Sequence, residues 1–159
     1  MSFNQYSQTI EELSIMEQFR TEFKDFPKGK LLKSESPDFI LKMNAKTAIG
    51  IELTKLHGST VRKVKTHFPR KINGYQPPEF NRENIDFTIQ AKNEKLPIYQ
   101  QKRLNQLWLL ITADLDESPV SFNLNNKLDN WSFSSGFRRI FLFELKNGKV
   151  YELNIRINS

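Results

Sequence analysis

The chain of 159 residues carries a net charge of +6, with 38% hydrophobic and 26% charged residues, a composition typical of a folded, water-soluble protein. It contains no cysteine, which excludes disulfides, thiolate-bound zinc and a cysteine nucleophile and makes a reducing cytoplasm the expected compartment. The sequence has no run of about 18 apolar residues that would predict a membrane span, and its first residues lack the pattern of a secretory signal.

The first predicted element is a helix over residues 8–23. Its apolar face is made by residues at helical spacing, namely Leu13, Met16, Phe19 and Phe23. Glu12 lies four residues before Met16, so its carboxylate points into the same apolar stripe. The helix ends at the segment FPKGK, whose Pro27 and Gly29 predict a turn.

Three strands are expected next, at residues 30–33, in DFILKM (38–43) and in AIGIELTKL (48–56), with NAKT as the hairpin turn. Asp38 stands at the head of the second of these strands. In the third strand, Glu52 projects from the face opposite the row of Ile49, Ile51 and Leu53. If the two strands are hairpin neighbours, both carboxylates converge on one side of the sheet.

A second helix is predicted from Phe80 or Asn81 to Leu96 or beyond. Lys92 lies in the middle of its apolar stripe, where an unpaired ammonium would be costly to bury. Pro97 is expected to kink or end this helix. The stripe is defined by residues at helical spacing, namely Ile85, Ile89, Lys92, Leu96 and Tyr99.

The rest of the chain completes a sheet. The apolar segment QLWLLIT predicts a strand buried on both faces. Residues 114–135 have no clear pattern, with room for a short helix, and FRRIFLFEL and VYELNIRI, joined by KNGK, predict a final hairpin. This order predicts a single α/β or α+β domain over residues 1–159, in which helices flank a mixed central sheet.

Asp38 and Glu52 together predict a metal site. Two carboxylates a few ångströms apart repel each other unless a cation lies between them. Carboxylate oxygens, with waters completing an octahedron, suit Mg²⁺ or Mn²⁺, and such a metal activates water and stabilises charge on a phosphodiester. Lys92 is expected to face an acid or a bound phosphate, with Lys95 as the second choice. Glu12 offers a further acid for the cluster.

The segments PDFIL and GIELT resemble the core of the PD-(D/E)XK nuclease superfamily, which has the restriction-endonuclease-like fold. Pro37-Asp38 matches the first motif, and Glu52-Leu53-Thr54 matches the second with Thr54 in the place of Lys. The later IQAKNEKLPIY, followed by LWLLI, resembles members whose catalytic Lys has moved to the following helix. The resemblance covers residues 12–111 and implies a core of order α-β-β-β-α-β and a Mg²⁺- or Mn²⁺-dependent endonuclease that hydrolyses DNA.

This resemblance implies a role for each candidate residue. Asp38 and Glu52 would hold the metal, and Lys92 would orient the nucleophile or stabilise the developing charge. Glu12 would assist through the metal or its waters, as a Glu of the preceding helix often does in the superfamily. Thr54 has no ammonium to polarise the scissile phosphate, so activity would depend on a helix Lys reaching the site.

The excess positive charge lies in one segment. Residues 55–78 contain six Lys or Arg and no Asp or Glu, whereas the remainder holds 18 basic and 18 acidic residues. A basic loop with interspersed aromatics suits the phosphate backbone of DNA, although it could also be a solvated loop whose charge maintains solubility. The residues expected to contact DNA are Arg62, Lys63, Lys65, Arg70 and Lys71.

Simpler interpretations stay open. Asp38 could cap its own strand, Glu52 could lie on a half-solvated strand, and Lys92 could extend its ammonium into water, while Glu12 could be solvated. Thr54 favours, as the alternative function, a catalytically inactive module of the same fold that binds nucleic acid or a protein partner. Thirteen Phe residues also leave room for an exposed apolar patch, and hence for a homodimer.

Overall fold

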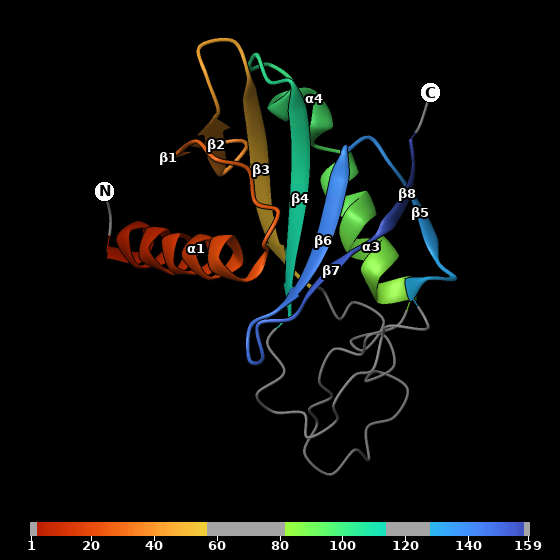
Figure 1. The fold of residues 1–159 in the computed structure, drawn as a ribbon. Coiled ribbons are helices and arrows are strands. Elements are labelled where there is room, and N and C mark those ends of the chain that lie inside the picture. Colours follow the sequence, from red (N-terminus) through yellow and green to blue (C-terminus); the bar gives the residue numbers. More distant parts are fainter. Residues whose placement is uncertain (1–2, 57–81, 114–127, 158–159) are drawn as a thin grey trace.

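The computed structural model describes residues 3–56, 82–113 and 128–157, and its central feature is a six-stranded mixed sheet (Figure 1). The parallel strands lie in the middle and the antiparallel strands at the edges. The mixed sheet predicted from the sequence is thus confirmed. In spatial order the strands are β1 (Lys30–Lys33), β2 (Phe39–Lys42), β3 (Ala48–Lys55), β4 (Gln106–Ala113), β6 (Arg139–Glu144) and β7 (Val150–Glu152).

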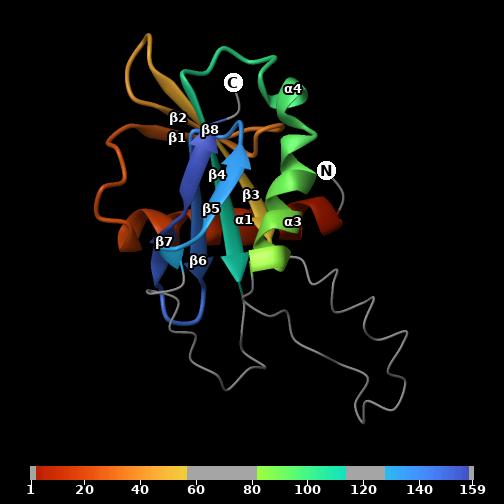
Figure 2. The same cartoon turned by 90° about the vertical axis from the view of Figure 1, so that its right-hand side faces the viewer.

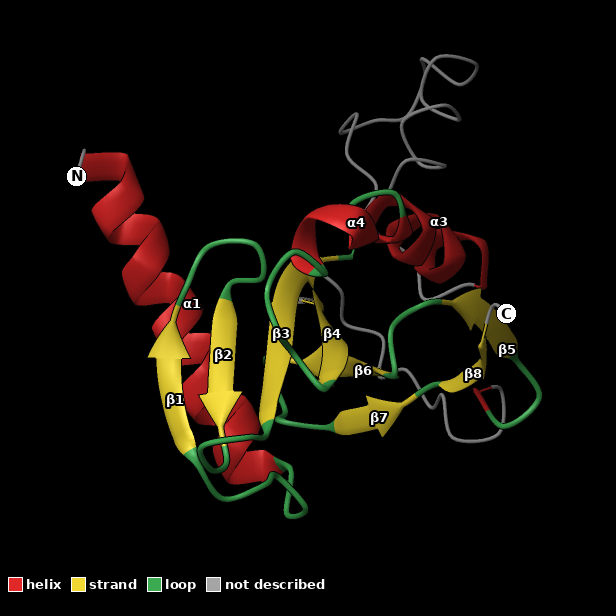
Figure 3. Ribbon diagram, turned by 90° about the horizontal axis from the view of Figure 1, so that it is seen from above, coloured by secondary structure: helices red, strands yellow, loops and turns green. Residues whose placement is uncertain are grey.

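Helices cover both faces of this sheet. The first, α1 (Phe3–Glu22), lies next to β1 and β2, whereas α3 (Arg82–Asn93) and α4 (Leu96–Tyr99) lie across the sheet from it (Figures 1 and 3). The chain from β3 to β4 carries α3 and α4, which is the crossover that two parallel neighbours require. Among the described helices, none is long and apolar enough to span a membrane.

Each face has its own apolar core, because successive side chains of a strand point to opposite sides. On the α1 face, Met16 and Phe19 pack against β3, β4 and β6, with Trp108 and Phe141 fully buried. On the α3 face, the alternate residues of β4, namely Leu107, Leu109 and Ile111, pack against α3, α4 and β6. The central strand β4 is therefore buried on both sides, as its continuous apolar sequence predicts.

The first helix differs from the prediction at its beginning and in its buried face. It begins at Phe3 rather than at residue 8, so its first turns extend beyond the predicted helix. Its buried face is centred between Ile15 and Met16, and Leu13, predicted to be internal, is 41% exposed. The spacing of Leu13 from Met16 and Phe19 is helical, but Leu13 lies at the margin of the stripe, where the helix turns toward solvent.

The second helical region is interrupted before the proline rather than at it. The helix α3 ends at Asn93, and α4 begins at Leu96 with Pro97 in its first turn, where a proline needs no backbone N–H. The predicted stripe survives this break, since Ile85, Ile89 and Tyr99 are all buried.

The C-terminal region contains a second, smaller sheet that the sequence analysis did not predict. The hairpin of β6 and β7 is confirmed, with Gly148 at a φ of 73° in its turn. The chain then leaves the main sheet at Leu153, and β8 (Asn154–Ile157) pairs in parallel with β5 (Ser132–Ser135) beside α3 (Figure 2). The sequence of β5, SFSS, has one apolar residue and so gave no strand signal. The short helix considered within residues 114–135 falls partly outside the described residues.

The packing of α1 predicts unequal effects of two similar truncations. Phe19→Ala should lower the free energy of unfolding by about 3–5 kcal/mol, because it leaves a cavity under four aromatic rings. Leu13→Ala, on the same helix, should have a much smaller effect, about 1 kcal/mol or less, because Leu13 is 41% exposed and lies outside the apolar core. Urea denaturation of both variants measures the difference, and equal losses would contradict this placement of the helix.

Candidate functional site

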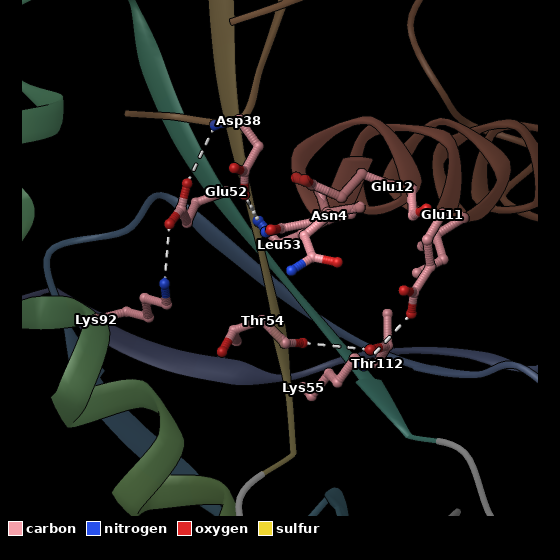
Figure 4. Close-up of a pocket in the computed structure, with 13 residues that line it drawn as sticks. Asn4, Glu11, Glu12, Asp38, Glu52, Leu53, Thr54, Lys55, Lys92 and Thr112 are labelled. Carbon is pink, nitrogen blue, oxygen red and sulfur yellow. Dashed lines mark hydrogen bonds and ion pairs between the residues drawn. The ribbon is translucent and has the colours of Figure 1, made fainter. Parts of the chain in front are cut away.

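The site lies where β2 stops pairing with β3. The register runs from Lys42 opposite Ala48 to Phe39 opposite Ile51, so β3 continues past the end of β2. There the carboxylate of Asp38 replaces a backbone partner: its Oδ2 accepts a hydrogen bond of 2.9 Å from the backbone N–H of Leu53. This contact ends the strand pair and brings Asp38 to the edge of β3 (Figure 4).

Local packing explains how the turn before β2 approaches β3 so closely. Pro37 is buried, and its ring lies against Gly50 on the face that also carries Glu52. A Cβ built on Gly50 would be 2.8 Å from Pro37 Cγ and 2.7 Å from a methyl of Leu104, closer than side chains tolerate. The glycine of the segment GIELT therefore makes room for the proline that precedes Asp38.

Glu52 is held by contacts from three different elements. Its Oε1 accepts a hydrogen bond of 3.1 Å from the backbone N–H of Asp38. Its Oε2 accepts one of 2.9 Å from Lys92 Nζ on α3 and one of 2.8 Å from the Tyr99 hydroxyl on α4. The Glu52 side chain is only 8% exposed and that of Lys92 18%. The Lys92 ammonium predicted to face an acid is therefore paired with Glu52.

The two acids have unusual titration properties. Burial raises the pKa of Asp38, and the nearby Glu12 raises it further, while the bond from Leu53 acts in the opposite direction. Burial also raises the pKa of Glu52, as does the charge of Asp38, although Lys92 and Tyr99 lower it. The pKa of Tyr99 is itself raised by burial and by Glu52, so its hydroxyl stays protonated and serves as a donor.

A second ammonium, that of Lys33 at the end of β1, faces Asp38 and Glu12 from the α1 side. Its Nζ lies 3.7 Å from Glu12 Oε2 and 4.0 Å from Asp38 Oδ1, and it donates to the backbone carbonyls of Ser34 and Asp38. The Glu12 side chain is 14% exposed, so the acid predicted to point inward from the first helix does so. The cluster thus combines three carboxylates with an ammonium on either side.

A pocket of about 530 Å³ opens over this cluster. Its floor contains Asp38, Glu52 and Lys92, and its wall on one side is the first half of α1 (Figure 4). An ion pair of 3.3 Å between Glu11 of α1 and Lys55 of β3 spans another part of it. Both faces of the sheet contribute residues, because the pocket lies at a strand edge that β2 does not cover.

The structure brings some of the predicted site residues together and not others. Asp38, Glu52, Lys92 and Glu12 come together at the cluster, and Thr54 lines the pocket. Lys95 does not: it is exposed in the turn before α4 and lines no part of this pocket. The five basic residues predicted to contact DNA, Arg62, Lys63, Lys65, Arg70 and Lys71, lie outside the described residues.

The sequence analysis assigned no role to Lys33 or Tyr99, which both contact the cluster. Tyr99 stands seven residues after Lys92 on the same helical stripe, which is a signal that it faces the same way. Lys33 is the register partner of Phe39, next to Asp38, but this neighbourhood depends on the strand pairing. The pocket-lining residues of α1 that precede residue 8 were also missed, because the helix was predicted to begin only at residue 8.

The carboxylate oxygens of the cluster are suitable ligands for a hard divalent cation. Of the ammonium groups in the described residues, that of Lys33 is nearest to Asp38 Oδ1, at 4.0 Å. Glu52 Oε2 faces Lys92, and a cation would have to displace Lys92 or share this oxygen with it. No group of three or more His, Cys, Asp or Glu in the described part of the chain is arranged to hold a metal ion. A Mg²⁺ or Mn²⁺ ion held by two carboxylates and otherwise by water and substrate oxygens needs no third protein acid.

Asp38→Asn should stabilise the protein in a chelating buffer, with a pH dependence of defined sign. Because the pKa of Asp38 is raised on folding, the charged carboxylate is penalised in the folded state above that pKa, and the penalty vanishes below the unfolded pKa. The variant should therefore exceed the wild type in unfolding free energy near pH 8, by an amount that falls progressively toward pH 4.

Urea denaturation across this pH range measures the effect. The matched control is Asp129→Asn, which changes an exposed carboxylate away from the cluster. A stability difference that does not depend on pH, or a loss of stability at high pH, would contradict the assigned burial and repulsion at Asp38.

Comparison with known proteins identifies no relative: no family model, no curated protein and no solved structure matches this chain. The case for a function therefore depends on the site geometry and on the resemblance of its short motifs.

Proposed function

We propose that this chain is a metal-dependent nuclease of the PD-(D/E)XK superfamily, with the restriction-endonuclease-like fold, that hydrolyses phosphodiester bonds of DNA. The observation that carries the proposal is the 2.9 Å contact between Lys92 Nζ and Glu52 Oε2, beside Asp38. This contact supports the idea that Lys92 of α3 supplies the ammonium that the motif lacks because Thr54 stands in the place of Lys. The order of elements, α1-β1-β2-β3-α3-β4, also agrees with that of the superfamily core.

Asp38 and Glu52 are the residues that would hold Mg²⁺ or Mn²⁺. When bound, such an ion activates water for attack and neutralises negative charge on the phosphodiester. The charges of the pocket-lining side chains indicate that substrate binding would require this metal ion. Among the described residues, four carboxylates and two ammonium groups line the pocket, so a phosphodiester that met these residues without a cation would be repelled.

Lys92 is the residue proposed to act on the reacting groups. Hydrolysis adds a water oxygen to phosphorus, breaks the bond to the leaving oxygen and returns a proton to that oxygen. An ammonium beside the carboxylates can donate hydrogen bonds to the water or to the phosphoryl oxygens as their charge increases. Lys92 reaches this place from α3, whereas Tyr99 keeps Glu52 oriented by donating to the same carboxylate oxygen.

Lys33 and Glu12 are proposed to position the site rather than to react. Lys33 bridges the helix carboxylate and the turn that carries Asp38, which joins α1 to the sheet at this point. The basic segment of residues 55–78 remains the predicted contact for the DNA backbone.

Cleavage of plasmid and single-stranded DNA in the presence of Mg²⁺ or Mn²⁺ tests the proposal. Asp38→Ala, Glu52→Ala and Lys92→Ala should each reduce the cleavage rate at least about 100-fold, because each removes a group proposed to act in the transition state. Lys95→Ala is the matched control and should retain activity, because Lys95 is exposed and does not line the pocket. Cleavage that persists in all three site variants would refute the assignment.

A catalytically inactive module of the same fold is the second candidate. The observation that favours it is that polar groups of the site already bond one another: Glu52 Oε2 accepts hydrogen bonds from both Lys92 and Tyr99. Such a module would bind nucleic acid or a protein partner without hydrolysing it.

Calorimetric titration with Mn²⁺ distinguishes the two candidates. For the nuclease we expect heat of binding that Asp38→Ala abolishes and that the exposed control Asp129→Asn leaves unchanged. An absence of binding in the wild type would instead favour the inactive module.

A further inference from the structure

The walls of the pocket over Asp38 and Glu52 differ sharply in chemistry. The floor and the α3 side carry the groups proposed for hydrolysis. The opposite wall is the first half of α1, which presents Asn4, Ser7 and Gln8 together with Glu11. Figure 4 shows the side chain of Asn4 extending from α1 toward β3, across the pocket from Lys92. The proposed hydrolysis uses none of the uncharged side chains of this wall.

The α1 wall is unsuited to a phosphate backbone. Among the described residues of α1, none that lines the pocket carries a positive charge, whereas Glu11 and Glu12 both line it. A phosphodiester chain lying along this wall would face two carboxylates across a short distance. Among the described residues, the ammonium groups near this wall are already paired, Lys55 with Glu11 at 3.3 Å and Lys33 with Glu12 at 3.7 Å.

The same wall is well suited to the edges of nucleobases. The amides of Asn4 and Gln8 each offer both donors and an acceptor, and the hydroxyl of Ser7 offers one donor and an acceptor. Such side chains bond base edges in grooves and in unstacked single strands. In a duplex these edges are paired or face a groove, while the outer surface is phosphate.

The depth and size of the pocket point in the same direction. The side chain of Glu52, in the floor of the pocket, is only 8% exposed. A volume of about 530 Å³ is in the range of sites that enclose a small molecule, and so corresponds to a nucleotide unit rather than to the width of a helix of DNA.

The geometry points to single-stranded DNA, or a strand released from a duplex, as the substrate of this site, with its bases against the Asn4–Ser7–Gln8 face of α1 and its phosphate toward Asp38, Glu52 and Lys92. This inference rests on the proposed nuclease function and specifies its substrate. The α1 face acts as the element that recognises bases, and the cluster acts on the backbone.

The test compares one labelled oligonucleotide alone and annealed to its complement, with Mn²⁺ present. The single strand should be cleaved roughly tenfold faster or more, because a duplex must first give up base pairs to let a strand enter. Asn4→Ala and Gln8→Ala should each weaken single-strand binding about 2- to 10-fold, the effect of losing a hydrogen bond, as measured by fluorescence anisotropy.

Gln18→Ala is the matched control, since Gln18 is exposed on the same helix but does not line the pocket. It should bind and cleave like the wild type. Because all three side chains are exposed, their removal is not expected to prevent folding. Duplex cleavage as fast as single-strand cleavage, or equal binding by all three variants, would overturn the inference and leave the nuclease proposal standing. If neither form is bound or cleaved, both proposals fail.

Discussion

The hydrogen bond from the backbone of Leu53 to the carboxylate of Asp38 is the contact on which the site depends. It replaces the next backbone pair of an antiparallel ladder, so β2 ends there while β3 continues. The end of β2 leaves one edge of β3 uncovered and places a carboxylate beside it. Without this termination, a longer β2 would cover the edge that the pocket now occupies, and Asp38 would be an ordinary strand residue.

The uncovered edge allows side chains from both faces of the sheet to meet. Glu52 points to the α3 face, where Lys92 and Tyr99 contact it, whereas Glu12 and Lys33 approach Asp38 from the α1 face. In a continuous sheet these two groups would be separated by a layer of backbone. In the proposed nuclease, this arrangement would let a lysine on a helix act at a site whose strand carries Thr54.

The charged forms of Asp38 and Glu52 are disfavoured in the cluster, and the nearby ammonium groups offset this only in part. Burial raises the pKa values of Asp38 and Glu52. The charge of Glu12 raises the pKa of Asp38 further, and the charge of Asp38 raises that of Glu52, even though Lys92 bonds directly to Glu52. A fold selected only for stability would place apolar or exposed residues at these positions. Acids that are buried, adjacent and directed into a pocket are the pattern expected where a site binds a cation or a charged reactant.

Strand and helix periods are local properties, and they were enough to predict the class of fold, the projection of Glu52 from the face opposite that of Ile51, and the inward direction of Glu12 and Lys92. The contacts that these side chains make depend on how distant parts of the chain pack. Lys33 reaches Asp38 through strand register, Tyr99 reaches Glu52 after the break before α4, and β5 pairs with β8 although its sequence is mostly serine. Contacts of this kind join residues far apart in the chain and depend on how elements pack, which no local period specifies.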